Sequence, residues 1–279
     1  MAETTDLFEY DPSVAAAIIF AVLFGIAMVT HAYQLIRTRT WFMLAFLIGG
    51  IFEFGGYIAR VFTAQETPNW SIGPFIIQHL LLLVAPALLA ASIYMELGRI
   101  ILLVHGEKHS IISRIWLTKI FVGGDIVSFL AQAIGAGSMA GQSTSAIKTG
   151  QTIILCGLVA QILSFMLFAV TAAIFHLRLL HTPTQKVLND AIPWRKHMFA
   201  LYASSFLILI RCVFRLVEYA QGRTGYLMSN EVFLYLFDSV LMLGTMIIFA
   251  MIHPSEVNAL LRGDGSKAIK KVVQVYSMV

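Results

Sequence analysis

Long apolar stretches separated by short polar segments run along most of this chain. The apolar residues come in continuous runs, about 18 residues or more in length, which is typical of membrane-spanning helices and not of membrane β-strands. Lipid offers a backbone no hydrogen-bond partners, so such segments must pair their own N–H and C=O groups. The pattern predicts seven spanning helices, at about residues 14–36, 41–63, 75–103, 112–138, 152–177, 199–221 and 231–252.

The composition supports a polytopic membrane protein. Of the 279 residues, 58% are hydrophobic and 12% are charged, whereas a soluble domain has about 25% charged residues. We therefore expect an all-α membrane protein, a seven-transmembrane-helix bundle that makes residues 1–279 one domain. Both cysteines fall inside spans, which argues against a disulfide framework. The net charge of +4 is expected to favour anionic lipid rather than nucleic acid.

The distribution of lysine and arginine predicts how the chain crosses the membrane. Most basic loop residues lie in the segments 36–40, 104–113 and 178–198 and in the tail after 252. The remaining loops, 64–74, 139–151 and 222–230, carry only Lys148 and Arg223. The first tail, MAETTDLFEYDP, has four acids and no base. The N-terminus is therefore expected outside the cell and the C-terminus in the cytosol.

Two features at the ends of spans follow from this orientation. The sequon Asn69-Trp70-Ser71 falls in an expected outer loop. The basic tail, residues 253–279, is expected to lie on the cytosolic side, where Lys267, Lys270 and Lys271 either approach the inner leaflet or stay in solvent.

Ionisable residues inside the apolar runs are the main functional signal. Five acids and five bases lie within or at the ends of spans: Glu53, Glu96, Asp125, Glu218, Asp238, Arg60, Arg99, Lys119, Arg211 and Arg215. A charge near the centre of a bilayer costs at least about 2.5–3.5 kcal/mol. Because the two signs balance, many of these charges are expected to be paired.

Their spacing places polar residues on single helix faces, at i, i+3 or i+4, and i+7. The sets are Glu53, Tyr57 and Arg60; Asp125, Ser128 and Gln132; and Arg211, Arg215 and Glu218. In the expected orientation they meet Gln78, His79, Gln161 and Asp238 in the middle and outer parts of the bundle. This convergence predicts a polar cavity, because fixing helix register alone would need fewer buried charges.

One pair and two further residues carry structural expectations. Glu96 and Arg99, three residues apart, are expected to pair near the cytosolic interface and to fix helix register. Pro86 is expected to kink the third span and to free a carbonyl group. His31 is interpreted as a core histidine.

Motifs along nearly the whole chain resemble those of the fungal lipid-translocating exporter family, also called RTA-like proteins. They are Tyr10-x-Pro12-Ser13, His31, Glu53-x-x-Gly56-Tyr57-x-x-Arg60, Ala85-Pro86, Ala91-Ser92-Ile93-Tyr94, Gly98-Arg99, Asp125-x-x-Ser128-x-x-x-Gln132-x-x-Gly135-x-Gly137, Gly157-x-x-x-Gln161, Arg211-x-x-x-Arg215-x-x-Glu218-Tyr219-x-x-Gly222, Glu231-x-x-x-Tyr235-x-x-Asp238 and His253-Pro254. The resemblance implies a seven-span protein of the fungal plasma membrane or another cell membrane. It also implies a link to the movement of sphingoid long-chain bases, to resistance against toxic amphiphiles, or to the handling of haem or porphyrin.

The first functional hypothesis is a transporter or translocator of an amphiphilic lipid. Its expected ligands are Glu53, Asp125 and Asp238 for an ammonium group, and Gln78, Gln132, Gln161 and Tyr57 for hydroxyl groups. Arg211 and Arg215 would hold the acids in place or bind a head-group phosphate. The chain has no nucleotide-binding motif, so export is expected to be downhill or coupled to protons. No cofactor or metal is expected in this hypothesis, and the oligomeric state is left open.

Two other functions stay open. A seven-span sensor would bind a lipid in the same cavity and signal through the loops 104–113 and 178–198. An intramembrane metalloenzyme would use Glu53, His79, Asp125 and Asp238 as metal ligands, although no HExxH or Gly-x-Ser-x-Gly motif is present. For haem, His31 and His79 are the candidate axial ligands.

Overall fold

Helices joined by short loops make up the described part of the chain. A computed structural model describes residues 10–67, 70–139, 143–189, 192–222 and 225–262. Its elements in chain order are α1 (Val14–Thr38), η1 (Trp41–Met43), α2 (Leu44–Gln65), α3 (Ile72–Leu103), η2 (Glu107–His109), α4 (Arg114–Met139), α5 (Thr144–His181), α6 (Gln185–Asn189), α7 (Trp194–Gln221), α8 (Glu231–Leu234), η3 (Tyr235–Ser239), α9 (Val240–Met251) and α10 (Ser255–Arg262). These residues include no strand, and the predicted all-α class is confirmed.

Seven helical segments are long and apolar enough to cross a membrane, and each falls on one predicted span. The largest difference is in α5, which begins at Thr144 rather than near residue 152. The Ser143 hydroxyl caps this helix by accepting a hydrogen bond from the Ala146 N–H. With 38 residues, α5 is about 57 Å long. It therefore extends beyond the ~30 Å hydrocarbon core, which hydropathy alone does not reveal.

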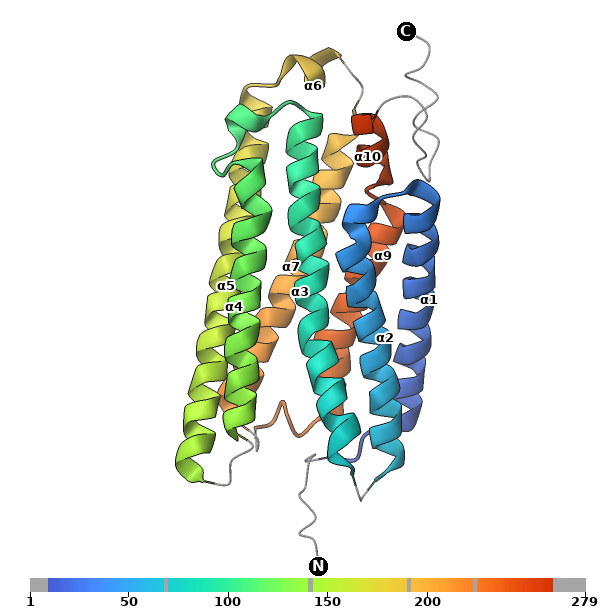
Figure 1. Cartoon of the computed structure of the whole chain (residues 1–279), viewed down its shortest axis with the longest axis vertical. Helices are drawn as coiled ribbons and strands as arrows, with labels where there is room; N and C mark the ends of the chain where they lie inside the picture. Colours follow the sequence, from blue (N-terminus) through green and yellow to red (C-terminus); the bar gives the residue numbers. More distant parts are fainter. Residues whose placement is uncertain (1–9, 68–69, 140–142, 190–191, 223–224, 263–279) are drawn as a thin grey trace, which may run out of the picture.

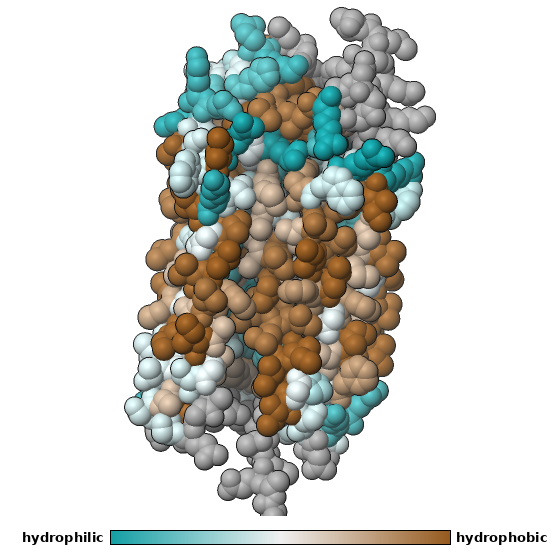
Figure 2. Space-filling view, viewed as in Figure 1, coloured by the Kyte–Doolittle hydropathy of each residue, from teal (hydrophilic) through white to brown (hydrophobic). Residues whose placement is uncertain are grey.

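The outer surface of the bundle is apolar. On α1, Ile19, Ile26, Val29 and Ile36 are each more than half exposed. Figure 2 shows an apolar band across the middle of the visible face, with hydrophilic residues gathered above it. A band of this kind suits contact with lipid tails rather than water.

The two ends of the bundle differ in charge. The N-terminal end carries the start of α1 and the loop from α2 to α3, whereas the opposite end carries η2, α6 and α10 (Figure 1). We call the opposite end the basic end, because it holds Arg37, Arg39, Lys108, Arg114, Arg178, Lys186, Arg195 and Lys196. Asn69 of the sequon and Lys267, Lys270 and Lys271 of the tail lie outside the described residues.

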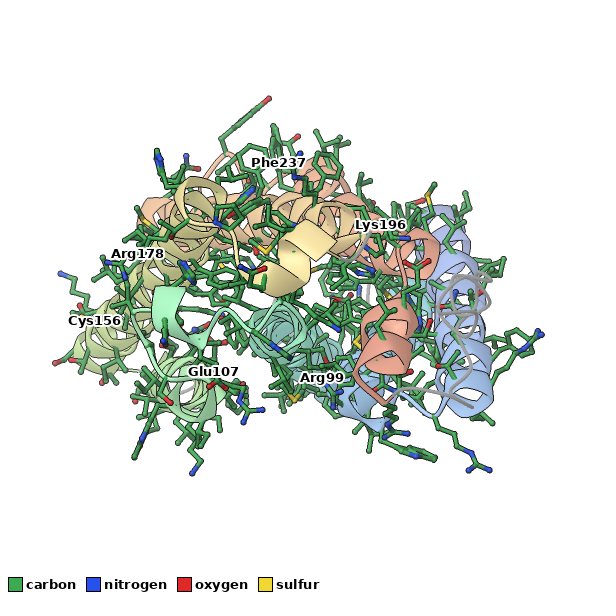
Figure 3. All side chains as sticks on the ribbon, turned by 90° about the horizontal axis from the view of Figure 1, so that it is seen from above. Arg99, Glu107, Cys156, Arg178, Lys196 and Phe237 are labelled. Atoms are coloured by element: carbon green, nitrogen blue, oxygen red, sulfur yellow. The ribbon has the colours of Figure 1, made fainter. Side chains whose placement is uncertain are left out.

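Helix α3 lies in the middle of the bundle when it is viewed from the basic end (Figure 3). It contacts α2, α4, α7 and α10. Its small residues Ala85, Ala90 and Ser92 are buried, which lets the neighbouring helices approach closely. A β-carbon at Gly49 of α2 would lie only 3.0 Å from the Ala85 carbonyl oxygen. This close approach brings the α2 face that carries Glu53 against α3.

The contact between α4 and α5 depends on a pair of glycines. A methyl group at Gly135 would lie 2.6 Å from the Gly150 carbonyl oxygen, whereas one at Gly137 would meet nothing within 4 Å. We expect Gly135→Ala to lower the free energy of unfolding by about 1–3 kcal/mol, because backbone atoms must move apart. We expect Gly137→Ala to have no effect or to stabilise the helix by up to about 1 kcal/mol. Thermal unfolding of both purified variants in detergent measures this difference, and equal midpoints would contradict the close approach.

Candidate functional site

A buried arginine of α7 joins three helices in the middle of the bundle. The Nη2 group of Arg211 donates a hydrogen bond of 2.7 Å to the Leu82 carbonyl oxygen of α3. Leu82 precedes Pro86 by four residues, and proline has no N–H to donate to that carbonyl. The carbonyl group that the sequence predicts to be freed is therefore satisfied by Arg211. The helix itself continues past Pro86 without a break.

The second partner of Arg211 lies on a π-helical turn. Its Nε group donates to Asp238, which is 1% exposed and belongs to η3. In this turn the Val240 N–H bonds to the Tyr235 carbonyl, five residues earlier. Such single turns are rare and occur frequently at functional sites.

Two more charged residues of α7 extend this arrangement. The Nη1 group of Arg215 donates to the Glu218 carboxylate at 2.8 Å. Its Nη2 group lies 3.9 Å from the second carboxylate oxygen of Asp238. All four side chains are buried. Together with Glu53 we call them the central charge cluster.

Glu53 is the unpaired member of the central charge cluster. It is 1% exposed, and its Oε1 atom has no hydrogen-bond partner. It interacts electrostatically with Asp238, Arg211 and Arg215, yet it forms no ion pair with any described residue. With every group ionised, the central charge cluster holds three carboxylates and two guanidinium groups. The cluster thus has one more acidic than basic side chain, and a cationic group is the partner that would pair with Glu53 in its ionised form.

Arg60 pairs with residues outside the central charge cluster. It donates to the Glu231 carboxylate at 2.7 Å and to the hydroxyl groups of Tyr10 and Tyr235 at 3.0 Å. Glu231 also accepts the backbone N–H of Ser13 at 3.0 Å. We call these five residues the Arg60 network, and it ties the start of α1 to α2 and α8.

Glu231 and Tyr235 were not among the predicted site residues. A signal for them is present in the sequence, because Glu231, Tyr235 and Asp238 repeat the i, i+4, i+7 spacing of Glu53, Tyr57 and Arg60. The Tyr57 hydroxyl meets the Ser239 hydroxyl of η3, so the two stripes face each other.

Other predicted residues pair away from the central charge cluster. Asp125 accepts the Tyr94 hydroxyl of α3 at 2.9 Å, and the Gln132 amide donates to Gln161 of α5 at 3.0 Å. Among the described residues, neither pair has a hydrogen bond or ion pair with the central charge cluster. Tyr94 is a partner that sequence spacing did not reveal. The structure thus divides the predicted polar set into separate hydrogen-bonded groups.

On α3, Gln78 and His79 lie about one turn before Leu82. Gln78 is 1% exposed, and its Oε1 atom has no hydrogen-bond partner. The His79 Nδ1 atom lies 2.9 Å from the Phe75 carbonyl oxygen, and the ring interacts electrostatically with Arg215 and Arg60. In this structure the central charge cluster is closed to the outside, because its five side chains are all buried.

The expected pair of Glu96 and Arg99 is wrong. Among the described residues, the ion-pair partner of Glu96 is His197 of α7, at 3.5 Å. Arg99 instead donates to Asn258 of α10 at 2.8 Å and stacks on the Phe42 ring. The reason is that α7 and α10 offer each side chain a partner from outside its own helix.

The same end of the bundle holds α10 in place. Glu256 of α10 meets Lys196 and lies 3.1 Å from the Nε2 atom of His197. His31 is buried, as expected of a core histidine, with its Nε2 atom 2.9 Å from the Met246 carbonyl oxygen. Within the described ranges, no group of three or more His, Cys, Asp or Glu residues is arranged to hold a metal ion.

These features define a class, a seven-helix integral membrane protein with a buried charge cluster in its centre. Residues 46–259 match the model of the family described as RTA1 like protein. The chain belongs to this family, as the resemblance of its motifs implied.

Relatives whose names state a function are fungal. The chain is 35% identical to "Protoporphyrin uptake protein 1" of Saccharomyces cerevisiae over 89% of this chain and 93% of that protein. It is 31% identical to "Probable lipid transporter atnI" of Emericella nidulans over 90% of this chain and 68% of that protein. It is 26% identical to "Sphingoid long-chain base transporter RSB1" of S. cerevisiae over 87% of this chain and 72% of that protein. No solved structure matches the chain.

The unequal roles of Glu53 and Asp238 give a test of the central charge cluster. We expect Asp238→Asn to lower the free energy of unfolding by about 3–5 kcal/mol, because it leaves Arg211 buried without its anion. We expect Glu53→Gln to leave stability unchanged or to raise it, because Glu53 has no ion-pair partner to lose. Thermal unfolding in detergent compares these two isosteric changes. A Glu53→Gln variant as unstable as Asp238→Asn would contradict the arrangement.

Proposed function

We propose that this protein moves amphiphilic lipids with a cationic head group, of the sphingoid long-chain base class, across the membrane. The observation that carries the proposal is the buried Glu53 carboxylate, which has an unpartnered oxygen. The names of two relatives give a lipid or a sphingoid long-chain base as the transported molecule.

The charge of the central cluster supports a cationic substrate. An ammonium group would bring three carboxylates and two guanidinium groups to neutrality. The Gln78 Oε1 atom is a second buried acceptor without a partner, suited to a hydroxyl group of the substrate. Glu53 would bind the ammonium group, while Arg211 and Arg215 hold Asp238 in place.

Entry of a head group requires the bundle to open, because the central charge cluster is buried in this structure. We propose that α2 separates from α3 to admit it. Their interface contains Gly49 and Gly56, and at Gly56 an added β-carbon would lie 2.7 Å from the Leu82 side chain. This interface is the one against which Glu53 lies, so its opening would expose the Glu53 carboxylate.

The distribution of basic residues supports one orientation of the protein in the membrane. We propose that the basic end faces the cytosol and that the N-terminal end faces outward, at the fungal plasma membrane. The Arg60 network would then lie near the outer surface, where it fastens the start of α1.

A porphyrin is the second candidate substrate, because the relative "Protoporphyrin uptake protein 1" covers most of the chain. A porphyrin with carboxylate side chains would need unpaired arginines. In this structure Arg60, Arg211 and Arg215 are each paired with a carboxylate. The contacts therefore favour a cationic head group over an anionic one.

Transbilayer movement of a fluorescent sphingoid base tests the proposal. The purified protein is placed in liposomes with nitrobenzoxadiazole-labelled sphingosine, and dithionite measures the fraction in the outer leaflet over time. We expect the wild type to accelerate movement and Glu53→Gln to reduce the protein-dependent rate about tenfold or more, through loss of a charge-assisted contact. The matched control is Glu107→Gln, at a carboxylate that is 60% exposed.

Three outcomes would contradict the proposal. Equal rates for Glu53→Gln and wild type would remove Glu53 from the path. Specific binding of the base without any movement would favour the sensor function. Protein-dependent movement of protoporphyrin, but not of the sphingoid base, would favour an anionic substrate.

A further inference from the structure

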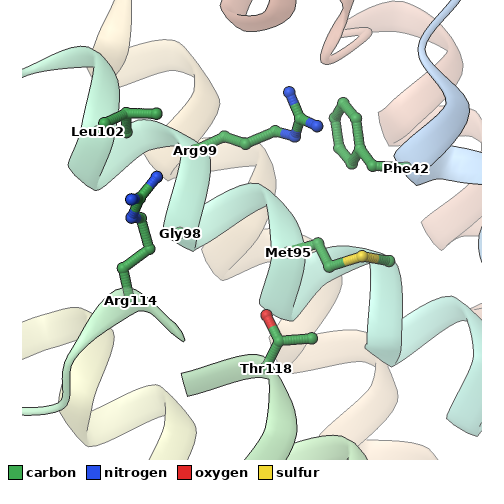
Figure 4. Close-up of a pocket in the computed structure, with 7 residues that line it drawn as sticks. All are labelled: Phe42, Met95, Gly98, Arg99, Leu102, Arg114 and Thr118. Atoms are coloured by element: carbon green, nitrogen blue, oxygen red, sulfur yellow. The ribbon is translucent and has the colours of Figure 1, made fainter. Parts of the chain in front are cut away.

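A second site lies away from the central charge cluster, at the basic end. A pocket of about 260 Å³ opens there between η1, α3 and the start of α4 (Figure 4). Two arginines, Arg99 and Arg114, line it with Phe42, Met95 and Thr118. No carboxylate of the described residues lines this pocket, and its walls carry the two positive charges of Arg99 and Arg114.

Two contacts fix the position of the Arg99 guanidinium group. Its guanidinium carbon lies 3.8 Å from the centre of the Phe42 ring, and its Nη1 group donates to Asn258 at 2.8 Å. A guanidinium group has five N–H donors, and Asn258 occupies one of them. Among the described residues Arg99 has no ion pair with a carboxylate, since Glu96 pairs with His197. The stacked, fixed geometry suits an anion with several oxygens.

Arg114 supplies the second guanidinium group from the first turn of α4. Its Nε group lies 3.4 Å from Glu107, but both side chains are well exposed, at 41% and 60%. An exposed ion pair of this kind contributes about 0–1 kcal/mol and is readily exchanged. Gly98 leaves room beside it, because a β-carbon there would lie 3.7 Å from the Arg114 side chain. Figure 4 shows the Arg114 guanidinium beside the Gly98 segment of α3.

We propose that this pocket binds a phosphate ester, with Arg99 and Arg114 donating to the phosphate oxygens. Two guanidinium groups form charge-assisted, often bidentate hydrogen bonds with phosphate. Met95 and Leu102 give the pocket an apolar edge, which suits an ester with a hydrocarbon substituent. Its volume is below the ~300–1,000 Å³ of pockets for drug-sized ligands, so it fits a head group rather than a whole lipid.

The phosphate has two possible sources, the head group of a membrane phospholipid or a soluble phosphate. Dioctanoyl phosphatidic acid and inorganic phosphate represent them in titrations of the purified full-length protein in neutral detergent. Thermal stabilisation and native mass spectrometry report binding without any transport step, so the result is independent of the proposed function. We expect dioctanoyl phosphatidic acid to bind the wild type at one tight site, and the double variant Arg99→Gln/Arg114→Gln to bind it at least about tenfold more weakly.

The matched control removes two exposed basic residues from the same end of the bundle, as Arg37→Gln/Arg178→Gln. This variant has the same net charge as the test variant and is expected to bind like the wild type. A third variant, Gly98→Leu, fills the pocket without changing charge and is also expected to lose binding. Midpoints of unfolding without ligand show whether each variant folds.

Each outcome decides one point. Loss of binding in both pocket variants, but not in the control, supports the site. Equal stabilisation by inorganic phosphate at the same concentration supports the phosphate chemistry and assigns a soluble source. Equal loss in the Arg37/Arg178 control shows general attraction of anions to the basic end and overturns the proposal. A folded Gly98→Leu variant that binds like the wild type also overturns it.

Discussion

The contact on which the centre of this bundle depends is the double hydrogen bond of Arg211. In a lipid environment three of its components would be unfavourable alone: a carbonyl group left without a donor by Pro86, a buried guanidinium group and a buried carboxylate. Together they satisfy one another, and they fix α7 against α3 and η3. Any change in the position of α7 therefore alters the backbone of α3 and the π-helical turn at the same time.

Two kinds of contact hold the rest of the bundle. Charged and hydrogen-bonding side chains join α1, α2, α8 and α10 to their neighbours, through the Arg60 network at one end and Glu256 at the other. By contrast, α4 and α5 meet through glycine backbone contacts, one pair of amides and the packed rings of Phe121 and Phe168. Ionic contacts have defined partners and break at high cost in lipid, whereas glycine contacts depend on close packing alone.

The sequence was sufficient for the seven helices, because lipid requires continuous apolar helices and leaves a clear pattern. It also indicated the carbonyl group freed by Pro86 and the buried charges. The partners of those charges could not be predicted, since spacing shows which residues share a face but not which helix lies opposite. Glu96 and Arg99 share a helix yet pair with α7 and α10, and Arg60 pairs with Glu231, far away in sequence. The early start of α5 was missed because polar helical turns outside the bilayer resemble a loop in hydropathy.

The π-helical turn at η3 changes the direction in which the side chains of the last apolar segment point around the helix axis. In a regular α-helix, Glu231, Tyr235 and Asp238 would share one face, and Asp238 would point where Tyr235 points, toward Arg60 of α2. The additional residue in the turn shifts the following residues by up to about 100° around the helix axis. Because of this rotation, one segment accepts hydrogen bonds from arginines on two different helices, Arg60 of α2 and Arg211 of α7. Without the additional residue in this turn, Asp238 would stay on the Tyr235 face, and Arg211 would lose the carboxylate that it binds on this segment.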